Sequence, residues 1–185
     1  MNSKTPVKKL TLISLGIALN IVGAFIALNL RLPIYLDSIG TIMIAALLGP
    51  KYAVITGVCG SLVSGMTFDI YSLYFAPVQI STGLLAGVMF NKDFLSGIKT
   101  PFGVLVVALP TSIIGSIIAA YLFGGVTSSG SSYIVQILKT IGVGDVISVF
   151  ITQFFTDYLD KFIGVVLVSL SVNAIPKNIR VSIKS

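Results

Sequence analysis

Residues 10–30, LTLISLGIALNIVGAFIALNL, form a run of 21 residues without a charged side chain. As a helix this run would rise about 31 Å, which is enough to cross the hydrocarbon core of a bilayer. Lys4, Lys8 and Lys9 precede the run, as in a secretory signal, but the apolar core of a cleaved signal has only about 7–15 residues. The run therefore predicts a first membrane span that is retained.

The composition of the whole chain agrees with a membrane location. Of the 185 residues, 55% are hydrophobic and only 10% are charged, whereas about a quarter of the residues of a soluble domain are charged. So few charges cannot solvate the surface of a compact globule. The length allows five or six spans of about 20 residues with short connections. We therefore expect an all-α, polytopic membrane protein with a single membrane domain over residues 1–185.

Apolar runs separated by Gly, Pro and charged residues mark the expected spans. Proline disfavours helix at the residue before it, so Pro33 marks the end of the first run. Pro77 falls in the first turn of the fourth run, where proline is tolerated, and Pro110 is expected to kink the fifth. The first five expected spans are residues 10–30, 38–49, 53–66, 75–90 and 101–123.

The last third of the chain permits two arrangements. Either residues 133–155 cross the membrane and a short seventh span follows, or they fold back near one face and a sixth span starts around Asp157. Positive charge decides between them, because cytoplasmic loops are rich in Lys and Arg. Six spans, with amino and carboxyl termini cytoplasmic, are predicted because they place most of the basic residues inside. These inner residues are Lys4, Lys8, Lys9, Lys51, Lys92, Lys99, Lys177, Arg180 and Lys184.

This topology gathers the acidic residues at the outer face, with only Asp93 inside. Ionisable groups at a membrane boundary are costly unless they are paired or face a wet cavity. Asp157 and Lys161 are four residues apart on one helix face and can pair, which is also compatible with a purely structural role. For Asp69 and Asp145, simple solvation in a loop is an equal alternative. The outer charged residues are Arg31, Asp37, Asp69, Lys139, Asp145, Asp157, Asp160 and Lys161.

Aromatic residues lie beside these charges, four of them between residues 68 and 75. Tyrosine at a membrane interface is commonly an anchor, but apolar walls with a few placed polar groups also make a small-molecule pocket. We therefore expect a binding site at the outer face. The predicted substrate-binding residues are Arg31, Tyr35, Asp37, Phe68, Tyr71, Tyr74, Gln79, Asp157 and Lys161.

Several kinds of chemistry lack the residues that they need. The sequence has no Walker-type phosphate loop, no His, no Glu and a single cysteine, Cys59. Hydrolysis of ATP at such a loop, a metal site or a conventional nucleophile–base pair is therefore not expected. We predict a non-catalytic protein with no metal and no cofactor. The net charge of +6 lies largely in short loops, where it sets topology, so no nucleic acid partner is expected.

Small residues one helical turn apart occur twice in the first expected span. Ser14 and Ala18 form one pair, and Gly23 and Ala27 the other. Small residues let two helices approach closely in lipid, although such spacing also arises by chance in apolar helices. These four residues are the predicted interface with a membrane partner.

Three stretches resemble a known family. They are residues 32–53, LPIYLDSIGTIMIAALLGPKYA, residues 76–87, APVQISTGLLAG, and the last span from Asp160-Lys161 to Ile175-Pro176-Lys177. Together they look like the substrate-binding S component of an energy-coupling factor (ECF) transporter, with the LLGP turn as the most specific element. The resemblance implies a multi-pass protein of the bacterial plasma membrane that binds one vitamin at its outer face with high affinity.

The resemblance also implies partners. S components work with a transmembrane coupling protein (T component) and two ABC-type ATPases, which supply the energy. They usually dock on the coupling protein through two alanines in span one. Ser14 and Ala18 stand at that place here, and the serine departs from the family pattern.

The form LPIYLDS looks most like that of the pantothenate-specific members. The carboxylate of pantothenate would need a cation, for which Arg31, Lys139 and Lys161 are the candidates. Hydroxymethylpyrimidine or pyridoxine, stacked on Tyr and Phe, is the alternative substrate. A non-transporting membrane scaffold and a self-sufficient ion-coupled transporter are the alternative functions.

Overall fold

The computed structural model describes residues 4–176, with side chains from residue 7 onward. This part of the chain is helical and has no strand, so the predicted all-α class is confirmed. The predicted inner charges at Lys177, Arg180 and Lys184, and the side chain of Lys4, lie outside the described residues. The helices are α1 (Lys4–Asn29), α2 (Ile39–Leu48), α3 (Pro50–Thr67), α4 (Tyr71–Tyr74), α5 (Ala76–Asn91), α6 (Thr100–Phe123), α7 (Ser131–Thr140) and α8 (Asp145–Ala174), with a 3-10 turn, η1 (Gly97–Lys99), before α6.

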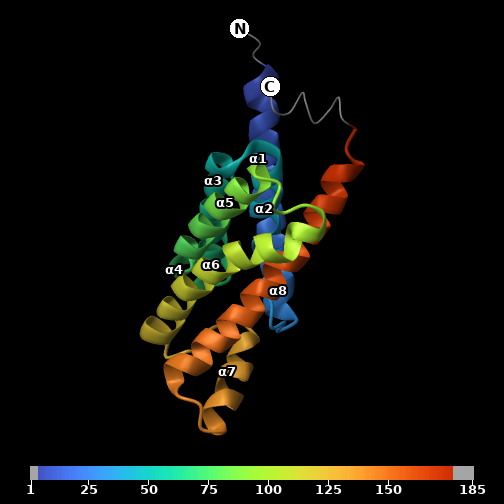
Figure 1. Cartoon of the computed structure of the whole chain (residues 1–185). Helices are drawn as coiled ribbons and strands as arrows, with labels where there is room; N and C mark the ends of the chain where they lie inside the picture. Colours follow the sequence, from blue (N-terminus) through green and yellow to red (C-terminus); the bar gives the residue numbers. More distant parts are fainter. Residues whose placement is uncertain (1–3, 177–185) are drawn as a thin grey trace.

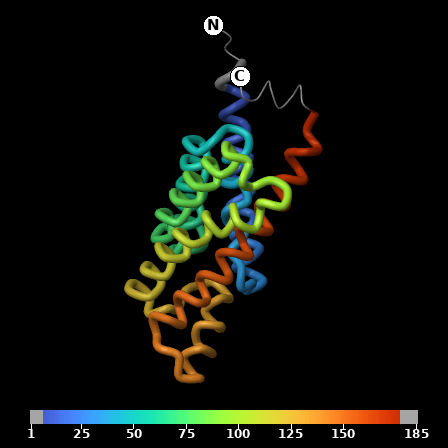
Figure 2. Tube along the Cα trace, viewed as in Figure 1, coloured from blue at the N-terminus to red at the C-terminus, as the bar shows by residue number. Residues whose placement is uncertain are grey.

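The long helices form an elongated bundle (Figure 1). From the start of α1, helices α1, α3 and α6 run toward the lower end of the view, and α2, α5 and α8 run back. The trace in Figure 2 shows the start of α1 and the last turns of α8 in the upper part of the molecule, and α7 at the opposite end. Helix α3 packs along α5, and α6 packs along α8. We call the end with the start of α1 the upper end, and the end with α7 the lower end.

Helix α2 is the short central element. It packs against α1, α3, α5 and α8, and because neighbours surround it, it is apolar nearly all round. Its ten residues rise about 15 Å, which is half of a bilayer core. Gly49 ends the helix with a φ of 86°, and α3 starts at the next residue, Pro50. The turn after the second span therefore consists of a single residue between the two helices.

Many polar and small side chains face inward while many large aliphatic side chains face outward, as the middle of helix α6 illustrates. Thr111 and Ser112 are fully buried, whereas Ile113 is 44% exposed and Ile117 is 53% exposed. The buried side of α3 likewise consists of Ala, Gly, Ser and Thr. Soluble proteins show the opposite distribution, whereas small residues line the helix contacts of membrane proteins.

Among residues 4–176, two helical segments are long and apolar enough to cross a membrane, Val7–Asn29 and Gly97–Phe123. The first overlaps the expected span one over residues 10–29, and the second contains span five. Pro110 is accommodated inside α6. The other expected spans correspond to helices that are shorter or carry more polar residues.

The last third of the chain differs from both expected arrangements. Residues 131–140 form α7, residues 141–144 turn, and α8 then runs without a break for 30 residues. The expected start near Asp157 was wrong by twelve residues, because Gly142, Gly144 and Asp145 do not interrupt a span. Gly142 and Gly144 belong to the turn, and Asp145 is the first residue of one long helix. A carboxylate at this position interacts favourably with the helix dipole.

Candidate functional site

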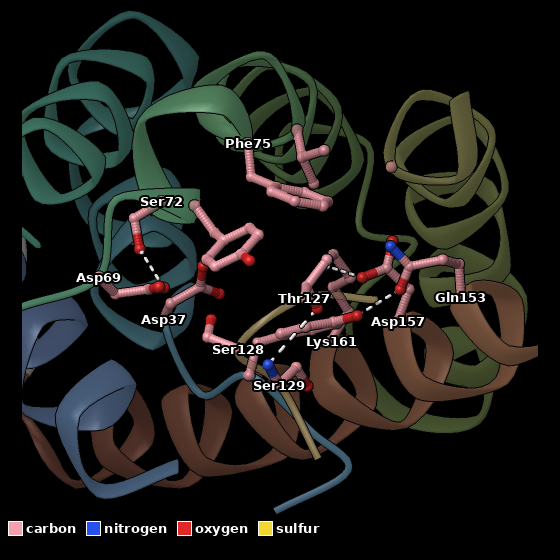
Figure 3. A pocket seen from close by; sticks show the side chains of 14 residues that line it. Asp37, Asp69, Ser72, Phe75, Thr127, Ser128, Ser129, Gln153, Asp157 and Lys161 are labelled. Atoms are coloured by element: carbon pink, nitrogen blue, oxygen red, sulfur yellow. Dashed lines mark hydrogen bonds and ion pairs between the residues drawn. The ribbon is translucent and has the colours of Figure 1, made fainter. Parts of the chain in front are cut away.

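A pocket lies where three connections meet the inner faces of α6 and α8. Its open space, counted together with the solvent at its mouth, is about 540 Å³. Figure 3 shows Asp37, Asp69 and Ser72 on one side of the cavity, Gln153 and Asp157 on the other, and Phe75 at its edge. The lining residues are Tyr35, Asp37, Asp69, Tyr71, Ser72, Phe75, Val78, Gly115, Thr127, Ser128, Ser129, Gln153, Asp157 and Lys161.

The structure brings five of the nine predicted substrate-binding residues to this pocket. Tyr35 and Asp37 come from the α1–α2 connection, Tyr71 from α4, and Asp157 and Lys161 from α8. The chain segments that carry them are far apart in sequence. They nevertheless converge on one cavity.

The other four predicted residues lie outside the lining. Arg31 is exposed, and its Nη1 donates a hydrogen bond of 2.7 Å to the Tyr133 hydroxyl in a separate hollow. Phe68 packs edge-on against Phe25 of α1. Tyr74 is half exposed and packs against Phe123.

Gln79, the fourth, is buried beneath the pocket and holds its floor. Its Nε2 donates to the Asp37 carbonyl oxygen at 3.1 Å, and its Oε1 accepts from the Thr41 hydroxyl at 2.9 Å. Asn20 of α1 extends this network, because its Oδ1 accepts from the Gly40 backbone N–H at 2.7 Å. Buried polar networks of this kind fix a single arrangement when every member is satisfied, so the network positions Asp37 at the cavity.

The ammonium group of Lys161 is committed to two carboxylates. Lys161 Nζ lies 2.9 Å from Asp157 Oδ1 and 3.7 Å from Asp160 Oδ2. All three side chains are at most 5% exposed. Such a buried charge is tolerated only when it is paired and hydrogen-bonded. Asp157 and Lys161 therefore line the pocket as an ion pair.

Asp160 serves the α1–α2 connection as well. Its Oδ1 accepts a 2.7 Å hydrogen bond from the Leu36 backbone N–H, and its Oδ2 accepts one of 2.9 Å from the Ser38 hydroxyl. Leu36 has a φ of 52°, a left-handed conformation that is unfavourable for a residue with a side chain. The carboxylate therefore holds this strained connection in place and presents Tyr35 and Asp37 to the cavity.

Among the described residues Asp37 makes no salt bridge, in contrast to Asp157 and Asp160. Burial, followed by the nearby charge of Asp160, raises the pKa of the Asp37 carboxyl to about 7. Burial and the charge of Asp157 raise the pKa of Tyr35 to about 12, so its hydroxyl stays protonated and donates to Gln153 Oε1. Asp37 is therefore the acid in the α1–α2 connection that can change charge near neutral pH.

Sequence reasoning missed several lining residues. Residues 127–129 belong to a Gly/Ser-rich stretch, a composition that indicates only a loop, but they line the cavity. Hydrogen bonds hold this loop, such as the one of 2.8 Å that the Thr127 backbone N–H donates to Ser132 Oγ. Gln153 was overlooked inside an apolar run. Its spacing was a usable signal, because Gln153, Asp157 and Lys161 follow at four-residue intervals and share one helix face.

The four predicted interface residues of α1 fall on two different faces. Ser14 and Ala18 are exposed. Gly23 and Ala27 are buried within the chain, where a Cβ on Gly23 would overlap the carbonyl oxygen of Leu36. In this structure only Ser14 and Ala18 remain free for a partner.

Comparison with known proteins adds no relative: no family model, no curated protein and no solved structure matches the chain. The function is therefore inferred from the chain's own residues and their arrangement.

Proposed function

We propose that this chain is a multi-pass membrane protein that binds a small polar molecule from the outside, as the non-catalytic substrate subunit of an ATP-driven uptake transporter. The observation that carries the proposal is the pocket. It combines aromatic walls, a row of hydroxyl groups and a buried ion-paired triad within a bundle whose outer surface is aliphatic.

The exposure of the helices supports the membrane location. Only 22% of the most apolar 18-residue window of α1 is buried within the chain, whereas the core helix of a soluble protein would be mostly covered. Large aliphatic and aromatic side chains are exposed on each of the long helices α1, α3, α5, α6 and α8. Exposed apolar surface of this extent requires a partner phase, and a bilayer supplies it.

The distribution of charge supports six spans with the pocket outside. Lys8 and Lys9 lie in the first turns of α1, Lys51 is the second residue of α3, and Lys92 and Lys99 lie at the two ends of the α5–α6 connection. Figure 1 shows the starts of α1 and α3 and the α5–α6 connection in its upper half. The α1–α2 and α6–α7 connections, which contribute to the pocket lining, lie toward the other end. By the positive-inside rule the basic end is cytoplasmic, so α1, α2, α3, α5, α6 and α8 are the proposed spans.

In this proposal the chain needs partner subunits for transport, because it does not hydrolyse ATP itself. A phosphate-binding loop is missing from the sequence, so energy from ATP would come from other subunits. The resemblance to ECF S components supplies the kind of partner, a transmembrane coupling protein with two ABC-type ATPases. The exposed pair Ser14 and Ala18 is the proposed place of contact, because small residues allow close helix approach.

Filling the pocket tests the binding function. Gly115 of α6 lines the cavity, and a Cβ there would meet Gln153 Nε2 at 3.2 Å, so a larger side chain must enter the ligand space. With purified protein in detergent, we expect one vitamin of a panel to stabilise the native protein. At a concentration of about a hundred times its dissociation constant, the gain in unfolding free energy is about 2.7 kcal/mol. Gly115→Leu should abolish that gain in a thermal unfolding assay.

A matched control is Ile113→Leu on the exposed face of the same helix, which should keep the full gain. No stabilisation by any vitamin would favour the scaffold alternative. Uptake of the bound vitamin by cells that lack coupling protein and ATPases would instead favour a self-sufficient transporter.

A further inference from the structure

The charges that line the pocket are unbalanced. Three carboxyl groups, Asp37, Asp69 and Asp157, face one ammonium group, Lys161. Asp160 adds a fourth carboxylate directly behind Lys161. Even with Asp37 protonated the site carries excess negative charge. An anionic ligand needs a free cation, and Lys161 is the one basic residue among the described residues of the lining.

The cations that a carboxylate ligand could use are occupied elsewhere. Lys161 is 2% exposed and bonds Asp157. Arg31 points to Tyr133 in a different hollow. Lys139 donates to the Gly124 carbonyl oxygen at 3.0 Å and pairs with Asp145 at 3.4 Å, away from the lining. A ligand that drew Lys161 away from Asp157 would leave that carboxylate buried without its partner, which is strongly unfavourable.

The charged groups of the lining that remain open to a ligand are carboxyl groups. Asp37 and Asp69 sit on the same side of the cavity, and both also border a smaller hollow that extends toward α1. Asp37 is surrounded by Asp157, Asp160 and Lys161 of α8, by Asp69 before α4 and by Tyr35 of its own connection. Its raised pKa means that a positive or hydrogen-donating guest favours its ionised form, whereas an anionic guest would require a proton there.

Aromatic rings complete the surface. Tyr71 and Phe75 line the pocket, and both rest on Phe123, with ring centroids 4.7 Å and 6.5 Å apart. The face of an aromatic ring attracts cations and stacks on planar groups. The aromatic and carboxylate walls therefore favour the same kind of guest.

We infer that the pocket selects a ligand that presents positive charge or N–H and O–H donors, such as an amino-substituted heteroaromatic ring, and that it rejects a carboxylate. This inference rests on the proposed binding function and narrows it. On this inference pantothenate is not the expected substrate, because its carboxylate would need a free cation in the site.

Two pairs of ligands that differ in charge on one scaffold test the inference by calorimetry. The first pair is pantothenate and panthenol, in which an alcohol replaces the carboxylate. The second is 4-pyridoxate and pyridoxamine, in which an amine replaces it. At pH 7.5 we expect the member without the carboxylate to bind at least about tenfold more tightly in each pair, because the buried carboxylates repel a further one.

Asp37→Asn should reduce that preference severalfold, since the amide keeps the shape and loses the charge. Asp93→Asn, an exposed change outside the pocket, is the matched control and should leave the preference unchanged. Tighter binding of pantothenate or 4-pyridoxate would overturn the charge inference and leave the proposed binding function standing. Binding of none of the four ligands by folded protein would count against both.

Discussion

Lys161→Met is expected to cost about 3–5 kcal/mol of folding stability, the range seen when one partner of a buried ion pair is removed. Methionine fills a similar volume, so the loss is electrostatic. It would leave Asp157 and Asp160 buried without their shared cation, which lies 2.9 Å and 3.7 Å from them. Since whole domains are stable by only about 5–15 kcal/mol, little folded protein should survive extraction. Size-exclusion profiles and thermal unfolding in mild detergent measure the effect.

The double variant Lys161→Met with Asp157→Asn is the matched control. It removes the cation together with the carboxylate that bonds it most closely, so it should recover much of the lost stability. This recovery is the coupling that a double-mutant cycle isolates. A single Lys161→Met protein that melts like the unchanged chain would show that the triad is not a buried ion pair.

Gly40→Ala is expected to have the second large effect, about 3 kcal/mol, at the upper end for overpacking. A Cβ on Gly40 would overlap the carbonyl oxygen of Gly16, so the backbones of α1 and α2 touch at this crossing. Neither backbone can give way, because the Gly40 N–H is also held by Asn20 Oδ1 at 2.7 Å. Thermal unfolding of the purified variant is the measurement.

Gly164→Ala on α8 is the comparison variant. There the added Cβ would meet only Ile42 Cδ1, at 2.8 Å, which is the end of a side chain that can shift. A loss of about 1 kcal/mol or less is expected. Equal losses for the two variants would contradict the close crossing of α1 and α2.

Much of the fold could be predicted because apolar runs and their Gly and Pro boundaries are local signals. The second expected span, 38–49, and the fourth, 75–90, agree with α2 and α5 to within one residue at each end. The start of α8 could not be placed, because Lys139, Gly142, Gly144 and Asp145 interrupt the apolar run 133–155 only briefly and polar residues also occur inside helices of this bundle. Charge counting concerns loops and gives no helix boundary.

The site was predictable in composition but only partly in membership. The aromatic and acidic residues near Asp37 and Asp157 pointed to a pocket at one end, where the structure has one. The Asp157–Lys161 ion pair could be predicted, because the two residues are four apart on one helix. The direction of Arg31 could not, because it has a φ of 50° and turns outward to Tyr133, which is 102 residues away in the sequence.

The central claim is that the chain crosses the membrane repeatedly, with the pocket end outside and the basic end inside. Cysteine labelling in protoplasts tests it directly. Cys59 is the only cysteine, so Cys59→Ala provides a clean background. Thr140→Cys, exposed on α7 at the lower end, and Ser96→Cys, exposed in the α5–α6 connection, then report on the two faces.

A maleimide that does not cross membranes should label the protein with Thr140→Cys in intact protoplasts, and the protein with Ser96→Cys only after lysis. Labelling of the Ser96→Cys protein in intact protoplasts, with the Thr140→Cys protein protected, would invert the bundle and close the pocket to the outside. Recovery of either protein in the soluble fraction would contradict the membrane location itself.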